Sequence, residues 1–127
     1  MLRQKREKLK PLVWVRSSKE DLKEFPETAQ SHIGFALQMA QRGGKHSGAK
    51  PMRGFGGASI IEIVEDYGGD TYRVVYTVKF EVAIYVLHAF KKKSKTGTAT
   101  PKHELSLIGE RLKHAQKLHA LKVYSKS

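Results

Sequence analysis

Cysteine is absent from this sequence of 127 residues. The chain therefore holds no disulfide, no thiol nucleophile and no cysteine-ligated zinc, and its composition is compatible with a reducing cytoplasm, where we expect it to act. Long apolar runs are also absent, since none approaches the roughly 20 residues that a membrane-spanning helix requires. The amino-terminal arm also lacks the large apolar face of an interfacial helix, so we expect no membrane partner.

Acidic residues are the next shortage. The sequence has 12 of them against 24 lysines and arginines, a formal net charge of +12. This excess favours a polyanionic partner, and composition alone would allow nucleic acid, an anionic membrane surface or an acidic protein. The length predicts one domain. We place it at residues 11–122, after a basic arm at residues 1–10.

Several catalytic motifs are missing as well. The glycine-rich stretch at 43–57 lacks the phosphate-loop pattern, and neither a Gly-x-Ser-x-Gly element nor a carboxylate pair is evident. His114 and His119 are five residues apart, which is not the spacing that places two imidazoles on one metal. We expect neither a metal nor a cofactor.

The residue patterns predict an α+β fold whose helices cover one face of a sheet. Ser17 and Glu20 have the spacing of a capping box that opens a first helix. Pro26 separates it from a second helix, which Gly43 and Gly44 end. A short strand is expected at 12–15, an antiparallel meander at 58–65, 71–78 and 81–90, and a final helix at 101–121.

Basic side chains gather where this meander would bring them together. Lys50 and Arg53 lie in the connector before the sheet, Arg73 stands early in the middle strand, and a predicted lysine-rich loop at 91–95 follows the last strand. Antiparallel pairing brings Arg73 close to the Glu65 and Phe90 ends of its neighbours. A phosphate on this rim would meet several cations, which suits RNA binding or stabilisation of a five-coordinate phosphate.

Each of these features also has a simpler interpretation. A lysine run is commonly a solvated loop. Arg73 could form an ion pair with Glu62 or Glu81 on the sheet. His88 could be a core or edge histidine with satisfied hydrogen bonds, and not an acid or base. The residues alone leave these alternatives open.

Five fragments carry a resemblance to a known family when taken in order. They are KPMRGFGG at 50–57, IIEI at 60–63, YRVVY at 72–76, YVLHAFKKK at 85–93 and TPKHEL at 100–105. With this arrangement the sequence resembles the RelE/HigB superfamily of toxins from bacterial toxin–antitoxin pairs, most closely its phage-derived HigB-like branch. The resemblance covers about residues 13–115.

The resemblance implies a fold and a function. The fold is α+β, with two amino-terminal helices packed on a twisted antiparallel sheet and a carboxy-terminal helix. The function is metal-independent, ribosome-dependent cleavage of messenger RNA, in which the ribose 2′-hydroxyl attacks the adjacent phosphate. The implied partners are the message, the ribosome and a cognate antitoxin, commonly a helix-turn-helix protein.

Matching positions suggest site residues. The resemblance implies that Arg73 contacts phosphate, that Lys92 or a neighbouring lysine stabilises the transition state, and that His88 is a candidate acid or base. The predicted RNA-binding residues are Lys50, Arg53, Lys91, Lys93 and Lys95. The first strand of the meander departs from relatives that carry two lysines there, because it has Ile61, Glu62 and Ile63. No general base is assigned.

Two other functions remain open from the sequence. A ParE-like toxin could share the fold and inhibit DNA gyrase. A module that binds RNA or the ribosome without catalysis would need only the cations.

Overall fold

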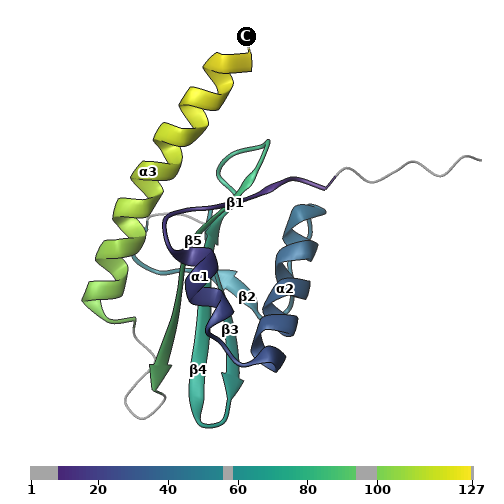
Figure 1. Cartoon of the computed structure of the whole chain (residues 1–127), viewed down its shortest axis with the longest axis vertical. Helices are drawn as coiled ribbons and strands as arrows, with labels where there is room; N and C mark the ends of the chain where they lie inside the picture. The colour runs from purple at the N-terminus through teal and green to yellow at the C-terminus, as the bar shows by residue number, and fades with distance from the viewer. Residues whose placement is uncertain (1–8, 56–58, 94–99, 127) are drawn as a thin grey trace, which may run out of the picture.

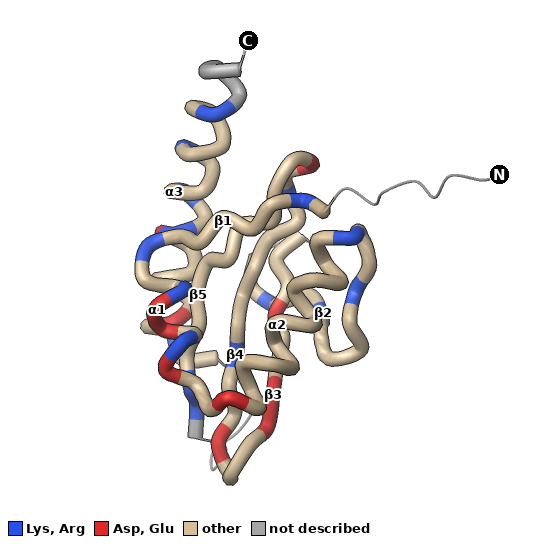
Figure 2. The backbone as a smooth tube through the Cα atoms, turned by 45° about the vertical axis from the view of Figure 1, so that its right-hand side comes forward, with Lys and Arg blue, Asp and Glu red and all other residues tan. Residues whose placement is uncertain are grey.

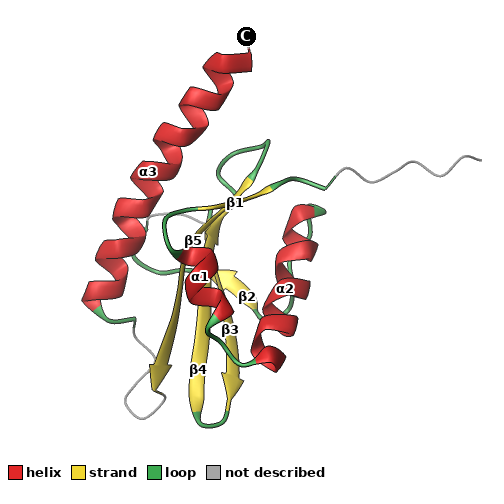
Figure 3. Cartoon of the chain, viewed as in Figure 1, coloured by secondary structure: helices red, strands yellow, loops and turns green. Residues whose placement is uncertain are grey.

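A computed structural model describes residues 9–55, 59–93 and 100–126, with side chains up to residue 122 apart from that of Lys93. Five strands and three helices follow one another along this part of the chain (Figures 1 and 3). They are β1 (Leu12–Trp14), α1 (Ser18–Lys23), α2 (Glu27–Gln41), β2 (Ala49–Pro51), β3 (Ile60–Tyr67), β4 (Asp70–Thr77), β5 (Ile84–Lys93) and α3 (Lys102–Lys126).

The strands form one sheet in the order β1-β5-β4-β3-β2. The antiparallel meander of β3, β4 and β5 is confirmed, with Gly68 and Gly69 at φ +61° and +88° in its first turn. The prediction of a fully antiparallel sheet is wrong, because β1 pairs parallel to β5 and makes the sheet mixed. β2 lies inside the stretch that we expected to be a connector, and three residues are too few to show an alternation.

Helices cover both faces of the sheet (Figure 1). On one face α2 packs through Ile33 and Leu37 onto a cluster that includes Val74 and Val86. On the opposite face, called here the α3 face, Ile108 packs against a second cluster that contains residues of β3, β4 and β5. The expectation of helices on one face is therefore wrong. Both faces of β5 are apolar, and each must be removed from water.

Pro26 and Gly43 mark the ends of the second helix, as the sequence predicted. Pro26 is the cap residue that opens α2. At its other end the Gly43 N–H donates to the Ala40 carbonyl at 2.9 Å, with Gly43 at φ +89°. The predicted capping box is not formed, because the Ser17 hydroxyl donates to the Asp21 carboxylate at 2.8 Å and does not accept from a backbone N–H of α1.

The two ends of the described chain lie in the basic arm and in α3. Of the basic arm, residues 1–8 lie outside the described residues, and Lys10 exchanges hydrogen bonds of 3.0 and 2.8 Å with Gln41 at the end of α2. α3 runs past the predicted residue 121 to Lys126. No helix in the described ranges has the length and apolar character to cross a bilayer.

Candidate nucleic-acid interface

A groove of about 650 Å³ opens on the α3 face between β2 and the start of α3. Lys50 and Arg53, both predicted to bind RNA, line it and are exposed. Pairing with β3 sets Lys50 opposite Glu62, which also lines the groove. Leu105 supplies an apolar wall from the first turns of α3. The structure thus brings the two connector cations to one concave surface.

Arg73 lies behind this groove. Its side chain is 8% exposed, and its Nη1 donates to the Glu62 carboxylate at 3.2 Å, while its Nε is buried without a hydrogen-bond partner. The register confirms the predicted neighbourhood, since Arg73 pairs with Val64 on one side and Phe90 on the other. Of the alternatives left open by the sequence, the structure shows the ion pair to Glu62.

The lysines after Phe90 divide between the two faces of the sheet. Residues 91–93 belong to β5, so the predicted loop does not begin at Lys91. Lys91 is exposed, forms a 3.7 Å ion pair with Asp70 and lines a pocket with Asp21 of α1. Lys92 is partly buried and pairs with Thr71. Strand alternation directs it to the α3 face, whereas Lys91 is on the α2 face.

Lys93 and Lys95, both predicted to bind RNA, cannot be placed relative to the groove. The side chain of Lys93 and all of Lys95 lie outside the described residues. Figure 2 shows acidic residues on α1 and on β3. The lysine run therefore begins within β5, beside carboxylates.

His88 faces α3 because β5 has a bulge. Val75 pairs with His88 and Tyr76 with Val86, so Leu87 is the extra residue in β5. Leu87 packs in the cluster under α3, and His88 bonds to α3 itself. Two successive side chains thus face the same helix. The bulge was not predicted from the sequence.

The two ring nitrogens of His88 both have partners. Arg111 Nη1 lies 3.0 Å from Nδ1 and can only donate, so Nδ1 accepts. Nε2 lies 2.7 Å from the Glu104 carboxylate and donates to it. Burial lowers the pKa of His88 below its ordinary value of 6.5, and the charge of Arg111 adds to this, while Glu104 opposes it. Neutral His88 with its proton on Nε2 fits this geometry.

One family model covers most of this architecture. Residues 20–113 match the family described as Phage derived protein Gp49-like (DUF891). The chain belongs to this family. Gp49-like proteins are RelE/HigB-like toxins and commonly act in toxin–antitoxin pairs. No curated protein matches the sequence.

In this Gp49-like chain, sequence reasoning missed two residues that hold the site together. Glu104 and Arg111 stand seven apart on α3 and both bond to His88. Arg111 also donates to the Leu87 carbonyl and to the Ser17 hydroxyl, each at 3.1 Å. Their seven-residue spacing beside the apolar stripe of α3 was the available signal.

This arrangement supplies a carboxylate rather than a free imidazole. Glu104 is 20% exposed on its side chain, and His88 is 6% exposed. Glu104 immediately precedes Leu105 of the groove wall. In the described ranges no three metal-ligating side chains are grouped so that they could hold an ion. The side chains that are present can transfer a proton and stabilise negative charge.

Proposed function

We propose that this Gp49-like protein is the toxin of a toxin–antitoxin pair, of the HigB-like branch, and that it cleaves messenger RNA on the ribosome without a metal. The main support for this proposal is the groove that Lys50 and Arg53 line. Among the described residues, none forms a hydrogen bond or ion pair with the side chains of Lys50 and Arg53, so both are available to phosphate. Glu104, which immediately precedes Leu105 of the groove wall, offers a carboxylate held by His88 at 2.7 Å.

The proposed reaction needs no added component. A base removes the proton of the ribose 2′-hydroxyl, the oxygen attacks the adjacent phosphorus, and the 5′-oxygen leaves with a proton from an acid. The products are a cyclic phosphate and a free 5′-hydroxyl. Charge builds on the phosphate oxygens during this step, and fixed cations stabilise it. Arg53 and Lys92 are our candidates for that task.

Glu104 is the proposed general base. Its carboxylate is the more exposed member of the pair, whereas both nitrogens of His88 are engaged. His88 would act as a positioning residue that fixes one carboxylate oxygen. Arg73, the proposed phosphate contact, would reach a substrate only after leaving Glu62.

The proposed partners follow from the family and the charge. We assign the toxin domain to residues 11–122 and expect an antitoxin of the helix-turn-helix type to neutralise it. The ribosome and its message supply the polyanion that the net charge of +12 favours. The arm at residues 1–10 would add affinity for ribosomal RNA.

Primer extension on a defined message in a reconstituted translation system tests the activity. We expect new 5′ ends with the native protein and a fall of about 100-fold or more in cleavage rate for Glu104→Gln, because a general base contributes that much. Lys79→Gln removes one exposed charge away from the groove and should cleave normally. Intact messages at every protein concentration would refute the proposal.

The buried Arg73–Glu62 pair gives specific support to the second candidate, a non-catalytic RNA or ribosome-binding module, because it withholds one cation from the groove. Such a module predicts ribosome binding that falls with salt, without cut products. A gyrase inhibitor predicts trapped cleaved DNA in a supercoiling assay and intact messages.

A further inference from the structure

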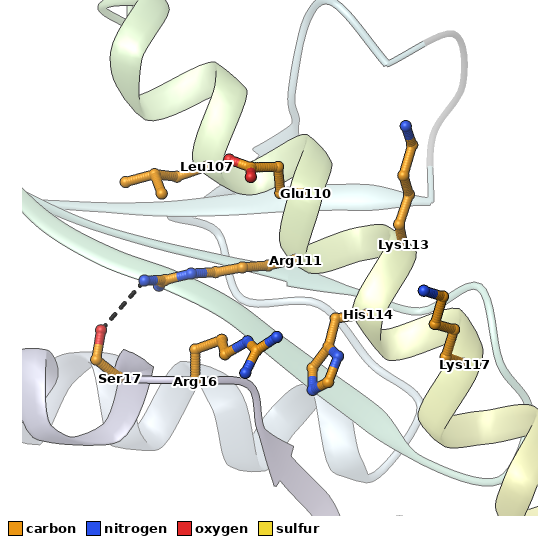
Figure 4. Close-up of a pocket in the computed structure, with 8 residues that line it drawn as sticks. All are labelled: Arg16, Ser17, Leu107, Glu110, Arg111, Lys113, His114 and Lys117. Carbon is orange, nitrogen blue, oxygen red and sulfur yellow. Dashed lines mark hydrogen bonds between the residues drawn. The ribbon is translucent and has the colours of Figure 1, made fainter.

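A second pocket, of about 510 Å³, lies between the turn after β1 and the middle of α3 (Figure 4). Among the described residues, it shares no lining residue with the groove. Its walls carry four cationic side chains and one carboxylate. They are Arg16, Arg111, Lys113, Lys117 and Glu110, accompanied by Ser17, Leu107 and His114.

Hydrogen bonds hold the backbone of the turn at Arg16, which forms one wall of this pocket. Arg16 has φ +53°, the one positive φ outside glycine in the described ranges. That conformation costs a non-glycine residue roughly 1 kcal/mol or more. It is held by neighbours, since the Val15 N–H donates to Val86 at 3.0 Å and the Ser18 N–H to Val15 at 3.1 Å. The turn therefore presents an exposed arginine at a constant position.

Opposite this turn, α3 presents its own cations. Lys113 and Lys117 are one helical turn apart, and His114 stands three residues before Lys117, so the three share one side of the helix. Figure 4 shows the Arg16 guanidinium directed towards His114. In the same view Glu110 lies on the other side of Arg111 from Arg16.

Three of the cations in this pocket have no partner among the described residues, although the Glu110 carboxylate also lines it. Arg111 donates to Leu87, His88 and Ser17. By contrast, no hydrogen bond or ion pair from any described residue reaches the side chains of Arg16, Lys113 or Lys117. Three cations around one concave surface attract an anion.

We propose that this pocket binds a phosphate of an RNA backbone, as a second contact outside the groove. A guanidinium matches two phosphate oxygens at once, and the lysines at the rim would follow the strand. An acidic peptide is disfavoured, because interface cores rely on aromatic and apolar anchors, and Leu107 is the one apolar residue among the described residues that line this pocket. The identity of the RNA, a structured ribosomal segment, rests on the proposed function.

Fluorescence anisotropy with a labelled RNA hairpin across a salt series tests the contact. Arg16→Asn removes the cation with a residue that tolerates positive φ, and Arg16→Lys keeps the charge. We expect Arg16→Asn and Lys117→Gln each to lower the slope of log affinity against log salt by about 1. Lys79→Gln is the matched control of equal charge loss and should bind more tightly than either.

Each outcome decides the proposal. If Arg16→Asn and Lys117→Gln bind the hairpin as Lys79→Gln does, the pocket is not an RNA site. If these variants keep RNA affinity but lose binding of poly-glutamate, the occupant is an acidic protein and the proposal is wrong. Primer extension with the native protein separates the two proposals. If the native protein cuts messages but the variants bind RNA as Lys79→Gln does, this pocket alone is refuted. If the native protein leaves messages uncut while the variants bind RNA more weakly than Lys79→Gln, the nuclease alone is refuted.

Discussion

Breaking the ion pair between Arg73 and Glu62 should destabilise the fold more than any exposed charge change. The two side chains are 8% and 9% exposed. Removing one partner of a buried pair costs about 3–5 kcal/mol, because the other charge stays buried without compensation. Against a total stability of about 5–15 kcal/mol, that loss is large.

The two single variants should differ. Arg73→Met leaves Glu62, which faces the groove and has Lys50 opposite on β2, so we expect the lower figure of about 3 kcal/mol. Glu62→Gln leaves the Arg73 guanidinium, whose Nε already has no partner, and should cost about 5 kcal/mol. The double variant Arg73→Met/Glu62→Leu should return to within about 1 kcal/mol of the native protein.

Urea unfolding at pH 7, followed by circular dichroism and by the fluorescence of Trp14, measures these differences. Lys91→Met is the control, since it breaks an exposed pair of 3.7 Å and should cost less than about 1 kcal/mol. Single variants that each lose under 1 kcal/mol, or a double variant that loses the sum of both, would refute the reasoning. A folded double variant also permits an activity test of Arg73 that unfolding does not confound.

Three further predictions concern protonation and backbone. Because burial lowers the pKa of His88, its contribution to stability is complete above pH 6.5 and is lost as the pH falls through the depressed pKa; His88→Gln should flatten the dependence of the urea midpoint between pH 7 and 5. Burial raises the pKa of Tyr76 to about 12 and also raises the pKa of Tyr85, so ultraviolet titration should show phenols that ionise above 10, with one fewer in Tyr76→Phe; the stability contributed by Tyr76 should be lost as the pH rises through 12. Gly43→Ala, at φ +89°, should lower the free energy of unfolding by about 1 kcal/mol, whereas Gly34→Ala in exposed α2 should raise it by about 0.5–1 kcal/mol; equal melting temperatures would contradict the pair.

The sequence predicted features that depend on near neighbours. The alternation in β3 and β4 with two glycines between them predicted the hairpin, and Pro26 and Gly43 predicted the limits of α2. The position of Arg73 beside Phe90 followed from the meander, because pairing between consecutive strands is set by their turns.

Features set by distant contacts could not be predicted. The parallel pairing of β1 with β5 joins residues about 70 positions apart, and nothing in Leu12–Trp14 specifies its partner. Glu104 is 16 residues from His88, and their bond depends on how α3 crosses the sheet. The sequence offered both Glu62 and Glu81 as ion-pair partners for Arg73, and charge alone does not decide between them.

The bulge in β5 has a consequence for how this chain tolerates variation. Leu87 is the residue of β5 without a partner in β4, and it faces α3 as its neighbour His88 does. Deleting Leu87 would leave a regular strand in which Phe90, Lys91 and Lys92 keep their partners in β4 and therefore their faces. The end of β5 is thus insulated from the loss of one residue at the bulge, and such a variant would lose one apolar contact under α3 while the lysines stay where they are.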